Sequence, residues 1–154
     1  MKRSFLLSLL LIAALWNAGC EKKTKTYAYA DVDKNLTITK DAERKLLDRV
    51  LEYRDARSRH DFKHTYAMEL PYDRFLKPYA MYEEEGNSLY RGFYTTVLKI
   101  KLDPSDERIA WVDRVYQYKR KGEKLQMRSK WIEVNGMWYH KYDFSVFPQT
   151  HPLR

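Results

Sequence analysis

The chain has 154 residues, of which 29 are Lys or Arg and 21 are Asp or Glu, so its formal net charge is +8. Because 44% of the residues are hydrophobic, there is enough apolar mass for a packed core, which excludes an intrinsically disordered chain. Only 5 Gly and 5 Pro accompany 13 Tyr, 6 Phe and 4 Trp, which excludes collagen-like and low-complexity sequences.

The first twenty residues have the parts of an export signal. Lys2 and Arg3 form a basic start, an apolar run follows over residues 5–16, and small residues precede Cys20. Twelve helical residues span about 18 Å, which is short of the roughly 30 Å apolar core of a bilayer. We therefore interpret residues 1–19 as a signal peptide and not as a transmembrane helix.

The sequence Asn17-Ala18-Gly19-Cys20 resembles the lipobox of bacterial lipoproteins. The resemblance implies that Cys20 becomes the first mature residue and carries acyl chains. Glu21 after it resembles the pattern that directs Gram-negative lipoproteins to the outer membrane. Cys20 is also the only cysteine, which suits a lipid anchor because a lone exported thiol is otherwise open to oxidation. The alternative is cleavage nearby, with Cys20 carrying no lipid.

Residues 20–39 are polar and contain few large aliphatic side chains. This composition is typical of a flexible tether, and a coil of some twenty residues would hold the domain roughly 25 Å from the membrane. The alternative is that part of the segment, over residues 27–39, forms an extra edge strand.

Residues 40–59 have the pattern of an amphipathic helix. Thr39 is placed to cap it, and Asp41 and Glu43 lie in the first turn, where the helix dipole favours acidic groups. Apolar residues recur on one face: Ala42, Leu46, Leu47, Val50 and Leu51. Arg54 projects into the same arc, so either the helix leaves the core there or a cation points inward.

Weaker patterns between residues 61 and 82 predict two short helices separated near Pro71. The second should end at Lys77, because the residue before Pro78 disfavours helical geometry. The acidic run over residues 83–85 is interpreted as a loop.

From residue 88 the apolar period changes to two, which predicts strands over 88–102, 109–118, 124–134 and 137–144. Asn135-Gly136 favours a tight hairpin turn between the last two. Helices followed by a meander indicate an α+β domain over residues 40–147, with a C-terminal tail over 148–154. We expect a long N-terminal helix and one or two short helices to pack on a curved antiparallel sheet.

The end of this meander follows the pattern Lys-Trp-x-x-Val-x-Gly-x-Trp-Tyr. The matching residues are Lys130, Trp131, Val134, Gly136, Trp138 and Tyr139. With the order of elements, this hairpin resembles the nuclear transport factor 2-like (cystatin-like) superfamily over about residues 40–144. The resemblance implies a cone-like fold. It implies no single activity, because the superfamily includes enzymes, ligand binders and docking modules.

Five residues are candidates for lining a pocket inside such a cone: Arg54, Trp111, Asp113, Trp131 and Trp138. A desolvated Asp113 carboxyl would have a raised pKa and could act as a general base. The alternatives are a buried ion pair with Arg54 or a place at the rim. The aromatic residues are equally compatible with a pocket, a protein interface or a plain core.

His60 and His64 are four residues apart, as two metal ligands on one helical face would be. The sequence offers no obvious third ligand, so no metal is predicted and solvent-facing histidines are the favoured interpretation.

The predicted hairpin around Gly122 carries a candidate basic patch of Lys119, Arg120, Lys121 and Lys124. Such a patch suits an anionic phospholipid or an acidic envelope protein, or it is simply a solvated hairpin whose lysines prevent edge pairing. Export argues against a nucleic-acid partner.

The sequence therefore predicts a membrane-anchored envelope lipoprotein without a cofactor, acting as a non-enzymatic module that binds a small apolar ligand or docks a protein. The alternative is a small isomerase-like or hydrolase-like enzyme that uses a pocket acid. A filled interior favours docking, and an enclosed cavity favours ligand binding or catalysis.

Overall fold

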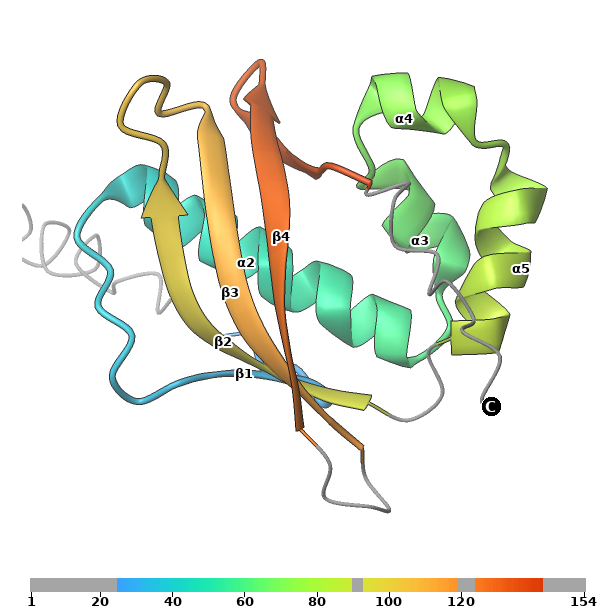
Figure 1. Cartoon of the computed structure of the whole chain (residues 1–154), viewed down its shortest axis with the longest axis horizontal. Helices are drawn as coiled ribbons and strands as arrows, with labels where there is room; N and C mark the ends of the chain where they lie inside the picture. The colour runs from blue at the N-terminus through green and yellow to red at the C-terminus, as the bar shows by residue number, and fades with distance from the viewer. Residues whose placement is uncertain (1–24, 90–92, 119–123, 143–154) are drawn as a thin grey trace, which may run out of the picture.

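The computed structural model describes residues 25–89, 93–118 and 124–142 (Figure 1). The signal peptide, Cys20, Lys119 to Lys121 and the tail over 148–154 lie outside the described residues. Within the described part of the chain, no helix is both long enough and apolar enough to cross a membrane.

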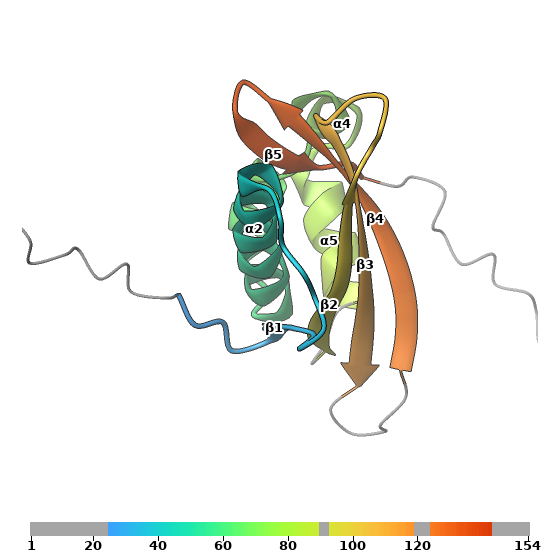
Figure 2. The same cartoon turned by 90° about the vertical axis from the view of Figure 1, so that its left-hand side faces the viewer.

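A five-stranded sheet forms one layer of the molecule, with the strands in chain order. Strands β2 to β5 pair antiparallel in sequence, which confirms the predicted meander. Figure 2 shows that the sheet is curved and that the long helix α2 lies against one face. The strands are β1 (Ala30–Val32), β2 (Phe93–Leu102), β3 (Ile109–Tyr118), β4 (Lys124–Val134) and β5 (Met137–His140).

Strand β1 lies inside the segment expected to be a tether. It runs parallel to β2, with Ala30 opposite Thr95, so the sheet is mixed and not purely antiparallel. Ala30 is buried, and the Tyr29 N–H donates to the Asp55 carboxylate at 3.0 Å. These contacts hold the segment on the domain, and of the two alternatives the edge strand is the one formed.

The predicted long helix is confirmed as α2 (Asp41–Ser58). Its N-cap is Lys40 and not Thr39 as expected. The Glu43 carboxylate turns back and accepts the backbone N–H groups of Thr39 and Lys40, at 2.9 and 3.0 Å. A carboxylate in the first turn thus satisfies donors that precede the helix.

The core lies between α2 and the sheet. Val50 and Leu46 of α2 are fully buried, as is Trp131 of β4, and Trp138 of β5 is 3% exposed. Val97 and Val112 of the central strands complete this layer. Burial of these apolar surfaces is the main term that holds the helix on the sheet.

Three helices follow α2, where one or two were expected: α3 (Phe62–Ala67), α4 (Pro71–Leu76) and α5 (Tyr79–Leu89). The acidic run over residues 83–85 lies inside α5, so its interpretation as a loop was wrong. Tyr82 is buried on this helix, and Glu85 binds the Lys77 ammonium. Tertiary packing and ion pairing therefore stabilise a helix whose sequence alone is polar. Because α5 extends to Leu89, β2 begins at Phe93 and not at 88.

We expect Gly86→Ala to lower the free energy of unfolding by about 1–3 kcal/mol, as overpacked side chains do. A Cβ at Gly86 would lie 2.5 Å from Cε1 of Phe62. Alanine in a helix interior normally stabilises a protein by up to about 1 kcal/mol relative to glycine. A loss of stability in Gly86→Ala would therefore indicate the steric conflict with Phe62. Asn87→Ala, at an exposed neighbouring position, is the control and should be neutral or stabilising. Urea unfolding measures both, and a Gly86→Ala protein as stable as its parent would contradict this packing.

Candidate functional site

The five candidate pocket residues do not converge on one site. Arg54, Trp131 and Trp138 are buried between α2 and the sheet. Along β3, the buried residues alternate with Trp111 and Asp113, which therefore point to the opposite face. Trp111 is 37% exposed there. The structure thus splits the set into a core group and an outer-face pair.

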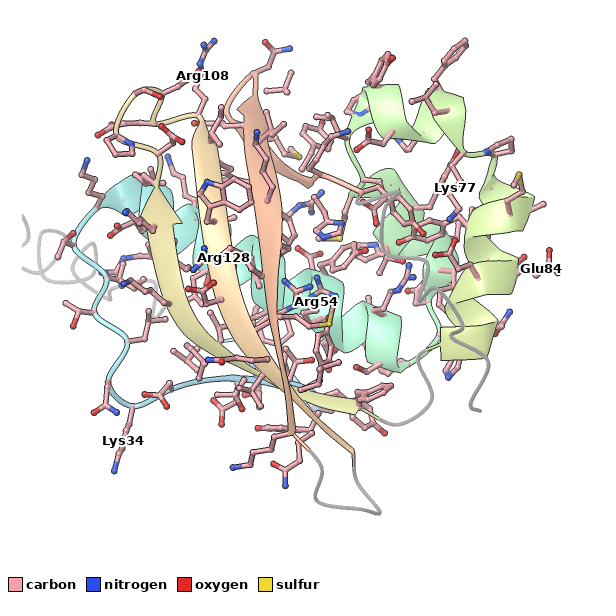
Figure 3. All side chains as sticks on the ribbon, in the orientation of Figure 1. Lys34, Arg54, Lys77, Glu84, Arg108 and Arg128 are labelled. Atoms are coloured by element: carbon pink, nitrogen blue, oxygen red, sulfur yellow. The ribbon has the colours of Figure 1, made fainter. Side chains whose placement is uncertain are left out.

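Asp113 pairs with Arg128 on the neighbouring strand and not with Arg54. The Arg128 guanidinium donates to both Asp113 oxygens, at 2.5 and 3.0 Å. Hydrogen bonds from Arg128 hold the pKa of Asp113 below its ordinary value. Figure 3 labels Arg128 on the sheet and Arg54 on α2. An ionised surface carboxylate lacks the raised pKa that the general-base hypothesis required.

Arg54 is 3% exposed and points inward, as one of the two interpretations predicted. Its guanidinium donates to the Tyr116 hydroxyl and lies 4.7 Å from the centre of the Tyr53 ring. Arg114 donates to the same hydroxyl at 3.0 Å and also to Ser129. Burial raises the pKa of Tyr116, but Arg114 and Arg54 outweigh it, so the pKa lies below its ordinary value.

A buried carboxylate, Glu69, is the centre of a second polar cluster. Glu69 is 1% exposed and accepts hydrogen bonds from Tyr53 of α2, Tyr82 of α5 and the His140 Nδ1 of β5. The last two are 2.8 and 2.7 Å long. The Tyr82 hydroxyl oxygen also lies 3.1 Å from Thr65 Oγ1 of α3, within hydrogen-bond distance. We call these five residues the Glu69 cluster, and they join three helices to the last strand.

The backbone fixes the geometry of this cluster. The Leu70 N–H donates to the His140 carbonyl, and the His140 N–H donates to the Met68 carbonyl, both at 2.9 Å. These two bonds make a parallel bridge between Glu69 and His140. The two side chains are therefore held face to face by their own main chains.

Burial raises the pKa of Glu69, but His140 and the hydroxyl donors outweigh it, so the pKa is lowered and the carboxylate is ionised at neutral pH. Burial lowers the pKa of His140 and the nearby Arg54 and Arg114 lower it further, against the effect of Glu69. The lowered pKa values of both groups are consistent with a neutral His140 whose Nδ1–H donates a hydrogen bond to an ionised Glu69. The sequence signal for Glu69 is an acid between two apolar residues, Met68 and Leu70, immediately before Pro71.

The hollow beside the Glu69 cluster is too narrow to admit a water molecule. Small-molecule sites measure roughly 300–1,000 Å³. The residues that line it are mostly polar: Tyr66, Glu69, Asp73, Arg74, Lys77, Tyr82 and Tyr142. This hollow therefore has no room for a substrate beside Glu69.

A larger cleft of about 510 Å³ lies at the surface, where the C-terminal end of α2 meets the start of α3 and the chain around Lys25. Asp55 at its base binds Arg59 at 2.8 Å. At its rim, His64 Nε2 lies 3.0 Å from the Glu52 carboxylate. We call this feature the α2-end cleft. It is polar and open to solvent, unlike an enclosed catalytic pocket.

His60 and His64 do not form the pair of ligands that their spacing permits. His60 has a positive φ of 65° just after α2, whereas His64 lies in α3 beside Glu52. Among residues 25–89, 93–118 and 124–142, no group of three or more His, Cys, Asp or Glu side chains is placed to hold a metal ion.

Exposed apolar side chains gather on α4 and the first turn of α5. Phe75 is 84% exposed, Tyr72 64%, Met81 58% and Leu76 50%. We call these four residues the α4–α5 apolar surface. The sequence predicted the α4 helix, but in a helix this short the apolar pattern did not distinguish the face that packs from the face left in solvent.

Of the candidate basic patch, Lys124 is exposed at the start of β4. Lys119, Arg120 and Lys121 lie outside the described residues, so the patch stays a prediction.

Comparison with known proteins assigns no family. No family model and no curated protein matches the chain. Solved structures that resemble it include the solution structure of a SEC-C motif containing protein from Rhodopseudomonas palustris. The two chains are 14% identical, the match covers 70% of this chain and 93% of the other, and the TM-score is 0.44. This similarity is too distant to assign a function, and the nuclear transport factor 2-like resemblance stays a prediction.

The Glu69 cluster makes the fold sensitive to acid. Below the ordinary histidine pKa of 6.5, the unfolded chain takes up a proton on residue 140 that the folded protein, with its lowered pKa, does not bind. The free energy of unfolding therefore falls as the pH falls through this range. A further loss is expected below 4.5, where the carboxyl of residue 69 becomes protonated in the unfolded chain first.

We expect His140→Asn to flatten the first of these two losses, because an amide can still donate to Glu69 but does not titrate. His60→Asn, at an exposed histidine, is the control and should keep the parent's pH dependence. Urea unfolding at pH 7.5, 6.5 and 5.5 measures the effect. Equal slopes for the parent and His140→Asn would show that His140 does not carry the acid sensitivity.

Proposed function

We propose that the mature protein is a lipid-anchored protein of the bacterial cell envelope whose domain docks a protein partner and performs no catalysis. The anchor is acylated Cys20, supported by the basic start, short apolar run and lipobox-like residues before it. Glu21 supports the outer membrane, facing the periplasm, as the location.

The observation that carries the docking function is the set of large side chains buried in the described interior. The Glu69 cluster, Arg54 and Trp131 occupy the space in which the alternatives would need a ligand or substrate. Asp113, the general base of the enzyme alternative, is on the outer face and bound to Arg128. A domain with a packed interior acts on other molecules through its surface.

The α4–α5 apolar surface is the proposed docking face. Aromatic residues and methionine are enriched at protein interfaces, and here Tyr72, Phe75 and Met81 are all exposed within one short stretch of the chain. Pro71 at the start of α4 and Pro78 before α5 restrict the backbone on both sides. Glu84, labelled at the edge of α5 in Figure 3, adds negative charge beside this surface. The partner we propose is an envelope protein that presents apolar side chains flanked by basic ones.

The anchor is tested by Cys20→Ser. We expect the parent to fractionate with membranes and to require detergent for extraction, because two or more acyl chains give stable membrane binding. The variant should lose the acyl chains, measured by incorporation of labelled palmitate, and should lose detergent-dependent extraction. A Cys20→Ser protein that still needs detergent for release would overturn the lipid anchor.

The docking face is tested by a photo-crosslinking residue placed at Phe75 in cells. We expect a discrete adduct with one protein from this position, and none from a control position at Arg108, which is also exposed but lies on the β2–β3 loop. Leu76→Ser in the same chain should reduce the adduct severalfold without unfolding the domain, because Leu76 is half exposed. Equal adducts from both positions, or an adduct unaffected by Leu76→Ser, would contradict this face.

A further inference from the structure

The distance between the proposed lipid anchor and the folded domain is short. The Tyr27 hydroxyl reaches the Asp48 carbonyl of α2 at 3.4 Å, and Tyr29 is held by Asp55. Lys25 lines the α2-end cleft. The domain therefore begins five residues after Cys20, where the sequence alone predicted about twenty residues of tether.

Chain length sets the reach of this connection whatever conformation residues 21–24 adopt. Five residues span at most about 18 Å when fully extended. By contrast, the 18 residues of α2 span about 27 Å. Figure 2 shows the first described residues beside the same end of α2 as β1, away from the end where the helix starts. The anchor thus keeps the C-terminal end of α2 close to the bilayer surface and leaves its N-terminal end farther away.

The surface at this end of α2 carries both signs of charge. The basic side chains that line the α2-end cleft are Lys25 and Arg59, and the acidic ones are Glu52, Asp55 and Asp61. Because the acidic side chains outnumber the basic ones, this lining has no net attraction for anionic lipid. A headgroup that carries both a phosphate and an amine matches it better, because each charge finds an opposite partner.

We propose that the α2-end cleft faces the membrane in which the protein is anchored and lies against zwitterionic phospholipid headgroups. The inference rests on the proposed lipid anchor at Cys20. It places the α2-end cleft in contact with lipid and gives the short connection a role in orienting the domain. The α4–α5 apolar surface, on other helices, stays available for docking.

The test uses the full mature protein, acylated on Cys20, in vesicles of phosphatidylethanolamine and phosphatidylcholine with a nitroxide-labelled phosphocholine headgroup as quencher. A fluorophore is attached through Lys63→Cys, next to the α2-end cleft, or through Arg108→Cys as the control. Arg108 adjoins Glu107, which binds Lys40 at the opposite end of α2. Vesicle flotation first establishes that the protein is anchored.

We expect severalfold stronger quenching at residue 63 than at residue 108. A flexible insertion of about twenty Gly and Ser residues after Glu21 would raise the fully extended reach from about 18 Å to about 90 Å and should remove most of the difference. Adding phosphatidylglycerol should change neither result.

Three outcomes would overturn the orientation: equal quenching at the two positions, a difference unaffected by the insertion, or quenching that requires phosphatidylglycerol. Failure to float with vesicles is a different result. It would mean that Cys20 carries no lipid, and it would overturn the proposed anchor itself.

Discussion

The ionised carboxylate of Glu69, 1% exposed, is the constraint on which the rest of the structure depends. Removing a carboxylate from water is costly unless its oxygens are paired and hydrogen-bonded. Here the donors come from Tyr53 on α2, Tyr82 on α5 and His140 on β5. Since these residues are far apart in sequence, the charge is satisfied only when the helices and the last strand are assembled together. The cluster therefore favours one arrangement of the small helices on the sheet.

The same requirement accounts for the contacts of the other buried polar side chains. His140 has both a carboxylate and aromatic neighbours, but its ring stacks on Tyr53 with 4.8 Å between ring centres and lies against Trp131. A general base must reach a substrate proton, and the described interior has no space beside this pair for one. Arg54 and Arg114 are also used within the fold. Both guanidinium groups donate to the Tyr116 hydroxyl, and Arg114 donates to Ser129 as well. These buried polar side chains form hydrogen bonds that join helices to strands.

The sequence predicted those elements whose periodicity is strong. The spacing of Leu46 and Val50 was sufficient for α2, and alternation was sufficient for β2 to β5, because each element has one apolar face. Helix α5 was missed because Lys77 and Phe62, outside the helix, stabilise a sequence that is polar by itself. The candidate pocket failed for a different reason. The face of β3 that is buried depends on the strand register. Asp113 lies directly between the buried Val112 and Arg114, so a shift of one residue would exchange the two faces.

Strand β1 links the fold to the proposed position of the protein at the membrane. Composition alone cannot distinguish a polar tether from a short edge strand, because β1 has only three residues and its stability comes from pairing with β2. Once Ala30 is buried and Tyr29 is bound to Asp55, the chain has lost most of the length that would let the domain move away from the proposed anchor. The pairing of β1 with β2 thus shortens the connection between the domain and the proposed anchor. The contacts of β1 and Tyr29, which complete the sheet, also place the C-terminal end of α2 nearer to the proposed attachment at Cys20.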